Sequence, residues 1–168
     1  MLLTPNLHQI EIKGYIPGAI GRITELHAVY YSQNWGLDVK FEAEVATELS
    51  EFLLRFDPSC DGIWTAVLNG EIVGAIAIDS SHAKHRSARL RWFIISPECQ
   101  GCGIGKLLLK KAIDFCQQVQ RNQIYLWTFS GLTAARHLYE KLGFVLDDEY
   151  TDNSWGNTVV HQKFTLEL

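Results

Sequence analysis

The apolar positions in the first third of the chain recur every three or four residues, the spacing of one face of an α-helix. Residues 18–36, "GAIGRITELHAVYYSQNWG", and residues 41–56, "FEAEVATELSEFLLRF", follow this pattern. Gly36 ends the first segment, where a left-handed glycine commonly terminates a helix. The expected buried faces are Ile20, Ile23, Leu26, His27 and Tyr30 in the first helix and Phe41, Val45, Leu49, Phe52 and Leu53 in the second.

The rest of the chain alternates between strand-like and helical patterns. Residues 62–79 contain two β-rich runs joined by Asn69 and Gly70, a dipeptide favoured in two-residue hairpins. Residues 122–129, "NQIYLWTF", have the pattern of a continuously buried strand. Further strands are expected at residues 10–16, 87–97, 144–150 and 159–166. The whole pattern predicts a mixed α/β fold.

Two more helices are expected in the second half of the chain. Residues 132–143 form one, which Gly143 closes. Residues 104–119 form the other. Lys111 fits on its buried face because the aliphatic stem of a lysine can pack against apolar side chains while the ammonium group reaches solvent. The expected buried face of this helix is Ile104, Leu107, Leu108, Lys111, Phe115 and Val119.

Length and composition favour one globular domain. The 168 residues are the size of one ordinary domain, so we expect a single domain over residues 1–168. The net charge of −4 gives no general attraction for nucleic acid or anionic lipid, and neither is an expected partner. No apolar run approaches the roughly 20 residues that span a bilayer, and the N-terminal segment lacks signal-peptide features. We therefore expect a cytoplasmic protein.

Residues 97–106, "PECQGCGIGK", place three glycines directly before a helix. Unpaired N–H groups at a helix start bind anions, and glycines let a ligand approach the main chain. A dinucleotide fingerprint does not fit, because the glycine spacing is wrong and the expected acid is replaced by Arg121 or Asn122. A nucleotide P-loop does not fit either, because Leu107 has no hydroxyl for magnesium. A plain turn that lets helix and strand pack closely remains an alternative.

The loop residues Gln100, Gly103 and Gly105 match a known pattern: Gln or Arg, then x-x-Gly-x-Gly or Ala. The loop thereby resembles the pyrophosphate loop of the GNAT acetyltransferases. About thirty residues later, "AARHLYEKLGF" resembles the second signature of that family, A-x-x-L-Y-x-x-x-G-F. "YIPGAIGRITELHAVYYSQNWGLDVKFEAEVA" and "LWTFSGLTAARHLYEKLGF" also resemble the acetyltransferase half of proteins that fuse such a domain to a winged-helix regulator. The resemblance covers nearly the whole chain, and the DNA-binding part of such fusions is expected to be absent.

This resemblance implies a GNAT fold, a mixed and mostly antiparallel central sheet with splayed strands flanked by helices. It implies an N-acetyltransferase that moves an acetyl group from acetyl-CoA, its co-substrate, to a primary amine by direct attack on the thioester. A module that binds acyl-CoA as a sensor or scaffold without catalysis is the alternative. The implied coenzyme-binding residues are Phe93, Ile94, Ile95, Gln100, Gly101, Cys102, Gly103, Ile104, Gly105 and Lys106.

Tyr139, in the second signature, is the implied proton donor to the departing thiolate, because a phenol stays protonated at neutral pH. It also fits as part of an apolar helix face. The base is not identified: Glu25, His27 and Glu98 are candidates, and each is as readily a surface charge or a buried histidine. Leu132 stands where many relatives have an asparagine, so contacts to the pantetheine arm are expected to differ.

The acceptor is either a small-molecule amine or a protein lysine. Arg89 and Arg91 alternate on one expected strand, so they share a face and are candidates to hold a carboxylate or phosphate. They are equally candidates for solvated surface charges. The tryptophans are expected to belong to the core, an acceptor pocket or a contact between two copies of the chain. These tryptophans are Trp35, Trp92, Trp127 and Trp155.

The four cysteines are expected to be free thiols. A zinc or redox site remains an alternative, since Cys99-x-x-Cys102 and His82-x-x-His85 supply four residues of the right type. Cys102, however, lies among the glycines expected to contact phosphate, and the sequence lacks a thioredoxin-like context for a redox pair. We therefore expect no metal.

Overall fold

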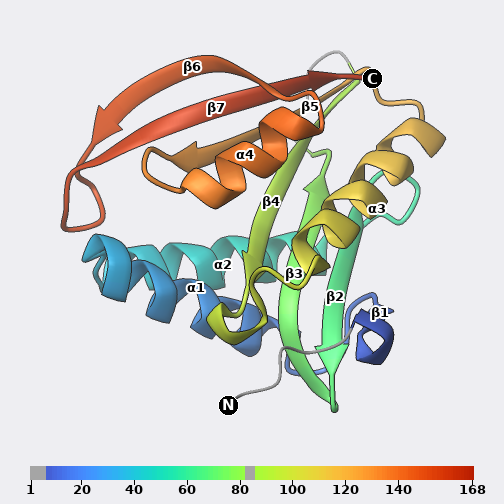
Figure 1. The fold of residues 1–168 in the computed structure, drawn as a ribbon, viewed down its shortest axis with the longest axis horizontal. Coiled ribbons are helices and arrows are strands. Elements are labelled where there is room, and N and C mark those ends of the chain that lie inside the picture. The colour runs from blue at the N-terminus through green and yellow to red at the C-terminus, as the bar shows by residue number, and fades with distance from the viewer. Residues whose placement is uncertain (1–6, 82–85) are drawn as a thin grey trace.

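The computed structural model describes residues 7–81 and 86–168, and this part of the chain forms one seven-stranded sheet in the order β1-β2-β3-β4-β5-β7-β6 (Figure 1). Its strands are β1 Glu11–Lys13, β2 Gly62–Leu68, β3 Glu71–Asp79, β4 Ser87–Ile95, β5 Gln123–Phe129, β6 Val145–Asp152 and β7 Val159–Glu167. The helices are α1 Ala19–Trp35, α2 Val39–Leu54, α3 Ile104–Gln118 and α4 Thr133–Lys141, with short 3-10 turns η1 Leu7–Gln9 and η2 Pro97–Cys99.

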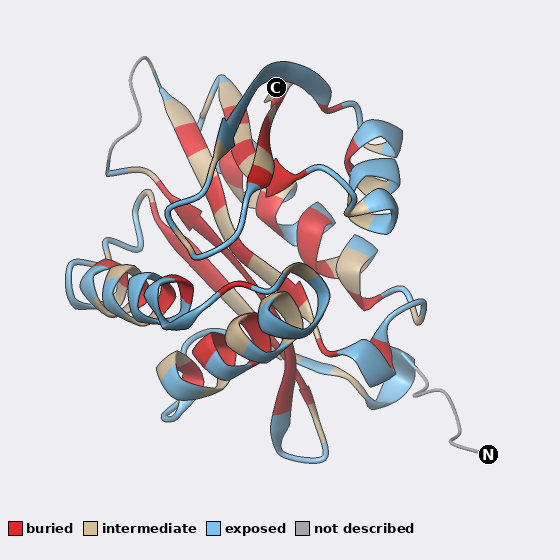
Figure 2. Ribbon diagram, turned by 90° about the vertical axis from the view of Figure 1, so that its left-hand side faces the viewer, coloured by how far each residue is buried: buried red, intermediate tan, exposed pale blue. Residues whose placement is uncertain are grey.

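Helices cover both faces of the sheet and enclose two separate apolar clusters. Residues of α1 and α2 pack with one face of β2, β3 and β4. Residues of α3 pack with the opposite face, together with Tyr139 of α4. The buried residues in Figure 2 accordingly concentrate on the strands and on the sheet-facing sides of these helices.

Local sequence signals set several of these boundaries as expected. Gly36 adopts φ 67° at the end of α1, and its N–H donates to the carbonyl of Ser32. Asn69 and Gly70 join β2 to β3 with φ of 52° and 86°, the left-handed pair that a tight hairpin of this type requires. The expected glycine helix stop and the expected hairpin are both confirmed.

Some details differ from the expected pattern. The first strand covers only Glu11–Lys13, because it pairs with just three residues of β2. On α3, Lys111 is exposed, and small side chains replace it on the buried face, which consists of Ile104, Leu108, Leu109, Ala112 and Cys116. β5 alternates in burial along most of its length, so the expectation of continuous burial is wrong there.

β4 and β5 separate halfway along their length. They form the parallel pair of the sheet, and their ladder joins residues 87–90 to residues 123–126 and stops there. β4 nevertheless continues to Ile95 and β5 to Phe129. All other neighbouring strands in the described residues are antiparallel. The expected fold class, a mostly antiparallel sheet with a splayed pair, is confirmed.

A β-bulge accompanies this separation. Trp92 and Phe93 of β4 face one residue of β3, and Trp92 has φ 46°. The bulge lies inside β4, and the strand ends at Ile95, before Pro97 begins η2. Beyond the bulge, the Ser96 N–H donates to β3 at Val73 O, 2.8 Å away. Since backbone groups alternate in direction along a strand, those of Ile95 point away from β3 and into the gap.

Within the described residues, none of the helices has the length and apolarity needed to cross a lipid bilayer.

Candidate active site

The glycine loop leads directly into the N-terminus of α3. Gly101 and Gly103 have φ of 79° and 87°, values that side-chain-bearing residues adopt only with strain. Gly103 is the N-cap of α3, with no capping side chain. The first helical hydrogen bond runs from Leu107 N to Gly103 O at 3.1 Å. The N–H groups of residues 104–106 precede it and form, with the helix dipole, a favourable place for an anion.

Gly105 serves a different purpose, since its φ is not left-handed. A Cβ built there would lie 3.4 Å from Phe93 Cζ and 3.6 Å from Leu138 Cδ2. The start of α3 therefore lies close to both β4 and α4. The alternative explanation, a glycine that permits close packing, applies to Gly105 but not to Gly101, whose Cβ would have nothing within 4 Å.

A groove of about 570 Å³, here called the coenzyme groove, opens beside this loop. The end of β4, the loop, the start of α3 and the first turns of α4 enclose it. Among the residues that the sequence assigns to the coenzyme, those lining the groove are Phe93, Ile94, Ile95, Gln100, Gly101, Gly103, Gly105 and Lys106. Cys102 and Ile104 do not line it, and the Ile104 side chain is buried in the core.

A second hollow of about 370 Å³, here called the acceptor cavity, lies on the side of the gap covered by α1 and α2. Its walls come from both of these helices, from β4 and β5, and from the hairpin of β6 and β7. Four residues line both hollows: Tyr31, Phe93, Thr128 and Tyr139. The groove and the cavity therefore meet at a shared wall where β4 and β5 separate.

Tyr139 belongs to this shared wall. Its side chain is only 4% exposed, and its ring packs against Phe93, Phe144 and Phe164 at centroid distances of 6.1, 5.8 and 6.0 Å. Burial raises the pKa of the phenol well above its usual value, so the hydroxyl carries its proton at neutral pH. Tyr139 thus packs in the core and also lines both hollows.

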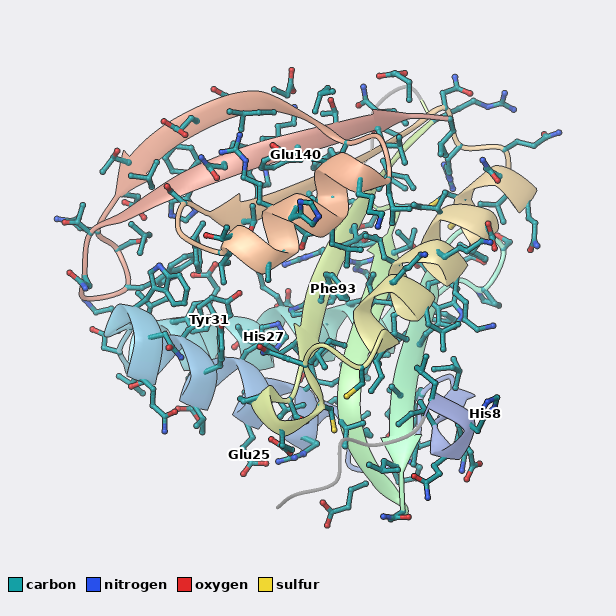
Figure 3. All side chains as sticks on the ribbon, viewed as in Figure 1. His8, Glu25, His27, Tyr31, Phe93 and Glu140 are labelled. Carbon is teal, nitrogen blue, oxygen red and sulfur yellow. The ribbon has the colours of Figure 1, made fainter. Side chains whose placement is uncertain are left out.

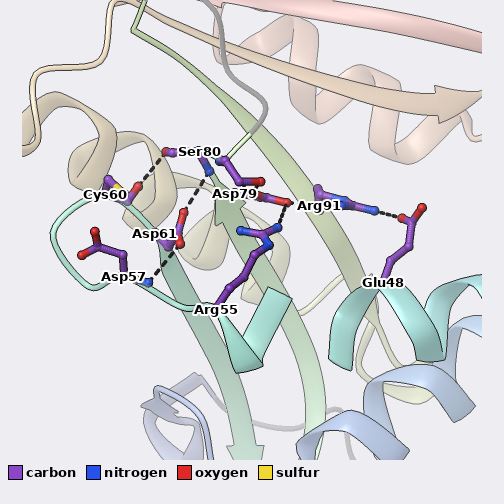
Figure 4. A network of polar contacts seen from close by, with 9 residues as sticks. Glu48, Arg55, Asp57, Cys60, Asp61, Asp79, Ser80 and Arg91 are labelled. Carbon is purple, nitrogen blue, oxygen red and sulfur yellow. Dashed lines mark hydrogen bonds and ion pairs between the residues drawn. The ribbon is translucent and has the colours of Figure 1, made fainter. Parts of the chain in front are cut away.

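The two arginines of β4 have different surroundings. Arg91 is 10% exposed, pairs with Glu48 of α2 and with Asp79 of β3 at 3.2 Å, and lies 4.1 Å over the Trp92 ring. Figure 4 shows this ion-pair network, in which Arg55 also reaches Asp79, at 2.8 Å. Both arginines line the acceptor cavity, but Arg91 is already neutralised by carboxylates.

Arg89 has no such partners. Its Nε atom is buried without a hydrogen-bond partner, and no carboxylate in the described residues lies within ion-pair distance of it. The structure therefore separates a paired Arg91 from an unpaired Arg89 in the same cavity.

The three base candidates also differ in position. Glu25 is exposed on α1 and pairs with Arg22 at 2.7 Å, while Glu98 is exposed in η2. Neither lines the acceptor cavity, whereas His27 does. Figure 3 labels both Glu25 and His27 on α1. The Nδ1–H of His27 donates to the Ile23 carbonyl at 2.8 Å, which places its lone pair on Nε2. Burial lowers the pKa of His27 to about 4, so the ring is neutral.

The polar residues of the acceptor cavity that sequence reasoning missed include Glu44 and His161. Glu44 accepts a hydrogen bond from Trp155 Nε1 at 2.7 Å. His161, on β7, is 4% exposed and stacks on Tyr150 with centroids 4.5 Å apart. Neither belongs to a local motif, because the cavity joins segments that are far apart in the sequence.

The acetyltransferase (GNAT) family model matches residues 21–144, about three quarters of the chain. The chain belongs to the GNAT family. N-acetylaspartate synthetase of Xenopus tropicalis is 31% identical over 118 residues, which are 68% of this chain and 42% of that protein. An uncharacterised N-acetyltransferase of Methanocaldococcus jannaschii is 32% identical over 88 residues, 50% of this chain and 39% of that protein. The GNAT chain thus spans about two fifths of these relatives' length.

Solved structures show the same GNAT fold. A GNAT acetyltransferase from Staphylococcus aureus matches with a TM-score of 0.75 at 20% identity, covering 95% of this chain and 99% of that one. The Salmonella typhimurium protein yncA, solved with its cofactor acetyl-CoA, matches with a TM-score of 0.71 at 16% identity, covering 95% and 94%. Identities this low establish the fold and leave the acceptor open.

Leu132, the departure from the second GNAT signature, lines the coenzyme groove just before α4. An aliphatic side chain there offers contact without a hydrogen bond. Trp92 is buried, and Trp92, Trp127 and Trp155 line the acceptor cavity. Trp35, the last residue of α1, packs against the core. The tryptophans thus contribute to the core and to the cavity.

Of the two residue pairs that could supply metal ligands, the structure describes only the cysteine pair. Cys99 and Cys102 are free thiols, but His82 and His85 lie outside the described residues. In residues 7–81 and 86–168 no three histidine, cysteine or acidic side chains gather in a group able to hold a metal ion.

Proposed function

We propose that this GNAT chain transfers an acetyl group from acetyl-CoA to a primary amine by direct attack on the thioester. The observation that carries the proposal is the meeting of two hollows at Tyr139, in the gap between β4 and β5. One hollow has an anion-binding loop, and the other has polar and aromatic walls. An acyl donor and an amine entering from opposite sides would meet at the shared wall.

The coenzyme lies in the coenzyme groove, with its diphosphate on the N–H groups of residues 100–106. The backbone groups of Ile95 that point into the gap pair with the amide groups of the pantetheine arm, as a neighbouring strand would. The Ile95 carbonyl, which accepts from Gln100 Nε2 at 3.2 Å, then exchanges that donor for the arm. Lys106 lines the same groove and adds a positive charge near the phosphates. This arrangement directs the thioester toward the gap beside Tyr139.

The transfer needs a neutral amine, stabilisation of the tetrahedral oxyanion and a proton for the leaving thiolate. The amine nitrogen bonds to the thioester carbon, and the carbon–sulfur bond then breaks. The Tyr139 hydroxyl gives its proton to the sulfur and regains one from solvent. Its raised pKa keeps the hydroxyl protonated until the thiolate forms.

The acceptor is a small amine that carries a carboxylate, in preference to a protein lysine. Several curated relatives are named N-acetylaspartate synthetase, so amino acids are the first acceptors to test. The unpaired Arg89 supplies the group that would bind the carboxylate. Arg91 is excluded from this role because Glu48 and Asp79 already occupy it.

The test is release of free thiol from acetyl-CoA with aspartate, alanine, spermidine and a lysine peptide as acceptors, with mass spectrometry of the products. We expect release with at least one amine, and fastest with an amino acid. Coenzyme A binding without release from any amine would contradict catalysis and favour the sensor or scaffold alternative.

Arg89→Ala should lower kcat/KM for an acidic acceptor by at least about tenfold, because the variant loses a charge-assisted hydrogen bond to the carboxylate. It should leave unchanged the kcat/KM for the analogue in which an uncharged amide replaces that carboxylate. Arg136→Ala is the matched control, since Arg136 is an exposed arginine on α4 paired with Glu140. An equal loss for both acceptors would refute the assignment of Arg89.

The likeness to the acetyltransferase half of winged-helix fusion proteins, the cytoplasmic location and a contact between two copies remain predictions.

A further inference from the structure

His161 has a fixed position in the acceptor cavity. It lies on β7 opposite Phe129 of β5 and Tyr150 of β6. Its ring stacks on Tyr150 with an interplanar angle of 2°, and the Phe129 ring meets it edge-on at 5.2 Å. The Trp155 ring lies 5.1 Å away on a third side. These contacts hold the imidazole in one orientation.

The two ring nitrogens of His161 have different surroundings. Nε2 is buried and has no hydrogen-bond partner. The carboxylate facing it is Asp152 of β6, 4.0 Å from Nε2 to Oδ2. With the proton on Nε2, toward this negative charge, the lone pair of the neutral ring lies on Nδ1. His161 itself is one of the residues that line the acceptor cavity.

We infer that His161 is the base that removes the proton from the acceptor amine, and that the negative charge of Asp152, 4.0 Å from Nε2, stabilises the protonated ring. This inference rests on the proposed acetyl transfer. It assigns a residue to the general base, a role for which the sequence alone identified none.

The charges around His161 partly offset the effect of its burial. Burial lowers its pKa, and the charges of Asp152 and Glu44 oppose this effect. The titratable neighbours from the packed elements are Asp152 and Tyr150 of β6 and Glu44 of α2, and Arg89 of β4 lies near Tyr150. His27, the other histidine of the cavity, has no carboxylate opposing its burial, and its pKa falls to about 4. A base works best when its pKa is near the working pH, which favours His161 over His27.

The proton balance closes without another reactant. As the amine nitrogen attacks the thioester carbon, one N–H proton moves to Nδ1 of His161. The carbon–sulfur bond breaks, and the thiolate takes the proton of Tyr139. The imidazolium then returns its proton to solvent, and Tyr139 regains one from solvent, so amine and thioester become amide and thiol.

The first experiment compares pH profiles of kcat/KM for thiol release by the wild-type chain and by His161→Gln. We expect the variant to lose about 10²-fold or more and to lose the limb that titrates below pH 7. Asp152→Asn should move that limb to lower pH, because it removes a charge that raises the pKa. His137→Gln, which changes an exposed histidine of α4, is the control and should match the wild type. An unchanged profile in His161→Gln would overturn the inference.

A second experiment does not depend on activity. In ¹⁵N-labelled protein, the histidine resonance missing from His161→Gln identifies His161, and its ring shifts report tautomer and pKa. We expect a protonated Nε2 at pH 7, a bare Nδ1, and a pKa lowered further in Asp152→Asn. A protonated Nδ1, or a pKa unaffected by Asp152→Asn, would refute the assignment even in a folded variant with normal coenzyme A binding. Failure of acetyl transfer itself would appear separately, as absent thiol release by the wild type.

Discussion

At the scale of single residues, Tyr139 combines packing with proton donation. Its ring contacts Phe93, Phe144 and Phe164, and a phenylalanine would keep these contacts. We therefore predict that Tyr139→Phe folds and binds coenzyme A normally, while turnover falls by about 10²-fold, the usual contribution of one acid–base group. Calorimetry and initial rates measure the two quantities, and unchanged turnover would remove Tyr139 from the mechanism.

His27 makes the stability of the protein depend on pH. Its pKa is about 4 when folded and near 6.5 when unfolded, so between these values the unfolded chain binds more protons. This contribution to stability is complete above about pH 6.5 and decreases as the pH falls toward 4, by up to about 3 kcal/mol. Urea unfolding of the wild type and of His27→Gln, from pH 7 to pH 4, tests this.

The variant should lose less stability on acidification, because it cannot gain that proton. Parallel stability curves for the two proteins would contradict the role given to His27.

The sequence could identify which residues carry chemistry but not which of them are already paired. Arg89 and Arg91 are equivalent in a strand pattern. Only the fold brings Glu48 and Asp79, each more than ten residues away, to Arg91. His161 belongs to no motif, because its neighbours come from β5, from β6 and from the loop after β6.

At the scale of elements, the start of α3 must lie close to β4 to form the coenzyme groove. Gly105→Val would place new atoms against Phe93 and Leu138, within the groove lining. We predict a loss of coenzyme A affinity of at least about tenfold, alongside about 1–3 kcal/mol of overpacking. Gly21→Val on α1 is the matched control, because its Cβ would have nothing within 4 Å.

Calorimetric titration of both variants with coenzyme A gives the comparison. Equal affinity in Gly105→Val and Gly21→Val would place the coenzyme elsewhere.

Most elements followed from local patterns, because helix faces, the Asn69–Gly70 turn and the Gly36 stop act over a few neighbouring residues. The buried face of α3 could not be predicted in this way. Ala112 and Cys116 add little to an apolar pattern, but their small side chains fit where the helix lies close to the sheet. The gap between β4 and β5 also has no local signal. It depends on a parallel ladder between segments more than thirty residues apart.

At the scale of the whole molecule, the two hollows meet and allow both substrates to be bound together. We predict sequential kinetics, in which initial-rate lines at several fixed amine concentrations intersect in double-reciprocal plots. Parallel lines would instead indicate an acetylated enzyme intermediate. Cys99, a thiol lining the groove, is 1% exposed and poorly placed to form one.

The family could be recognised from the sequence because two motifs, the glycine loop and the second signature, belong to single strand–helix junctions. The acceptor side could not be derived in the same way. Its cavity is assembled from α1, α2 and the β6–β7 hairpin, which come from opposite ends of the chain.

The proposed transfer depends on main-chain amides of the glycine loop, which hold a diphosphate and so place a thioester beside Tyr139. The decisive measurement is a crystal structure of the chain with acetyl-CoA. We expect the diphosphate on the N–H groups of residues 100–106, the pantetheine arm alongside Ile95 and the thioester next to the Tyr139 hydroxyl. An unoccupied coenzyme groove, or a coenzyme bound at another surface, would contradict it.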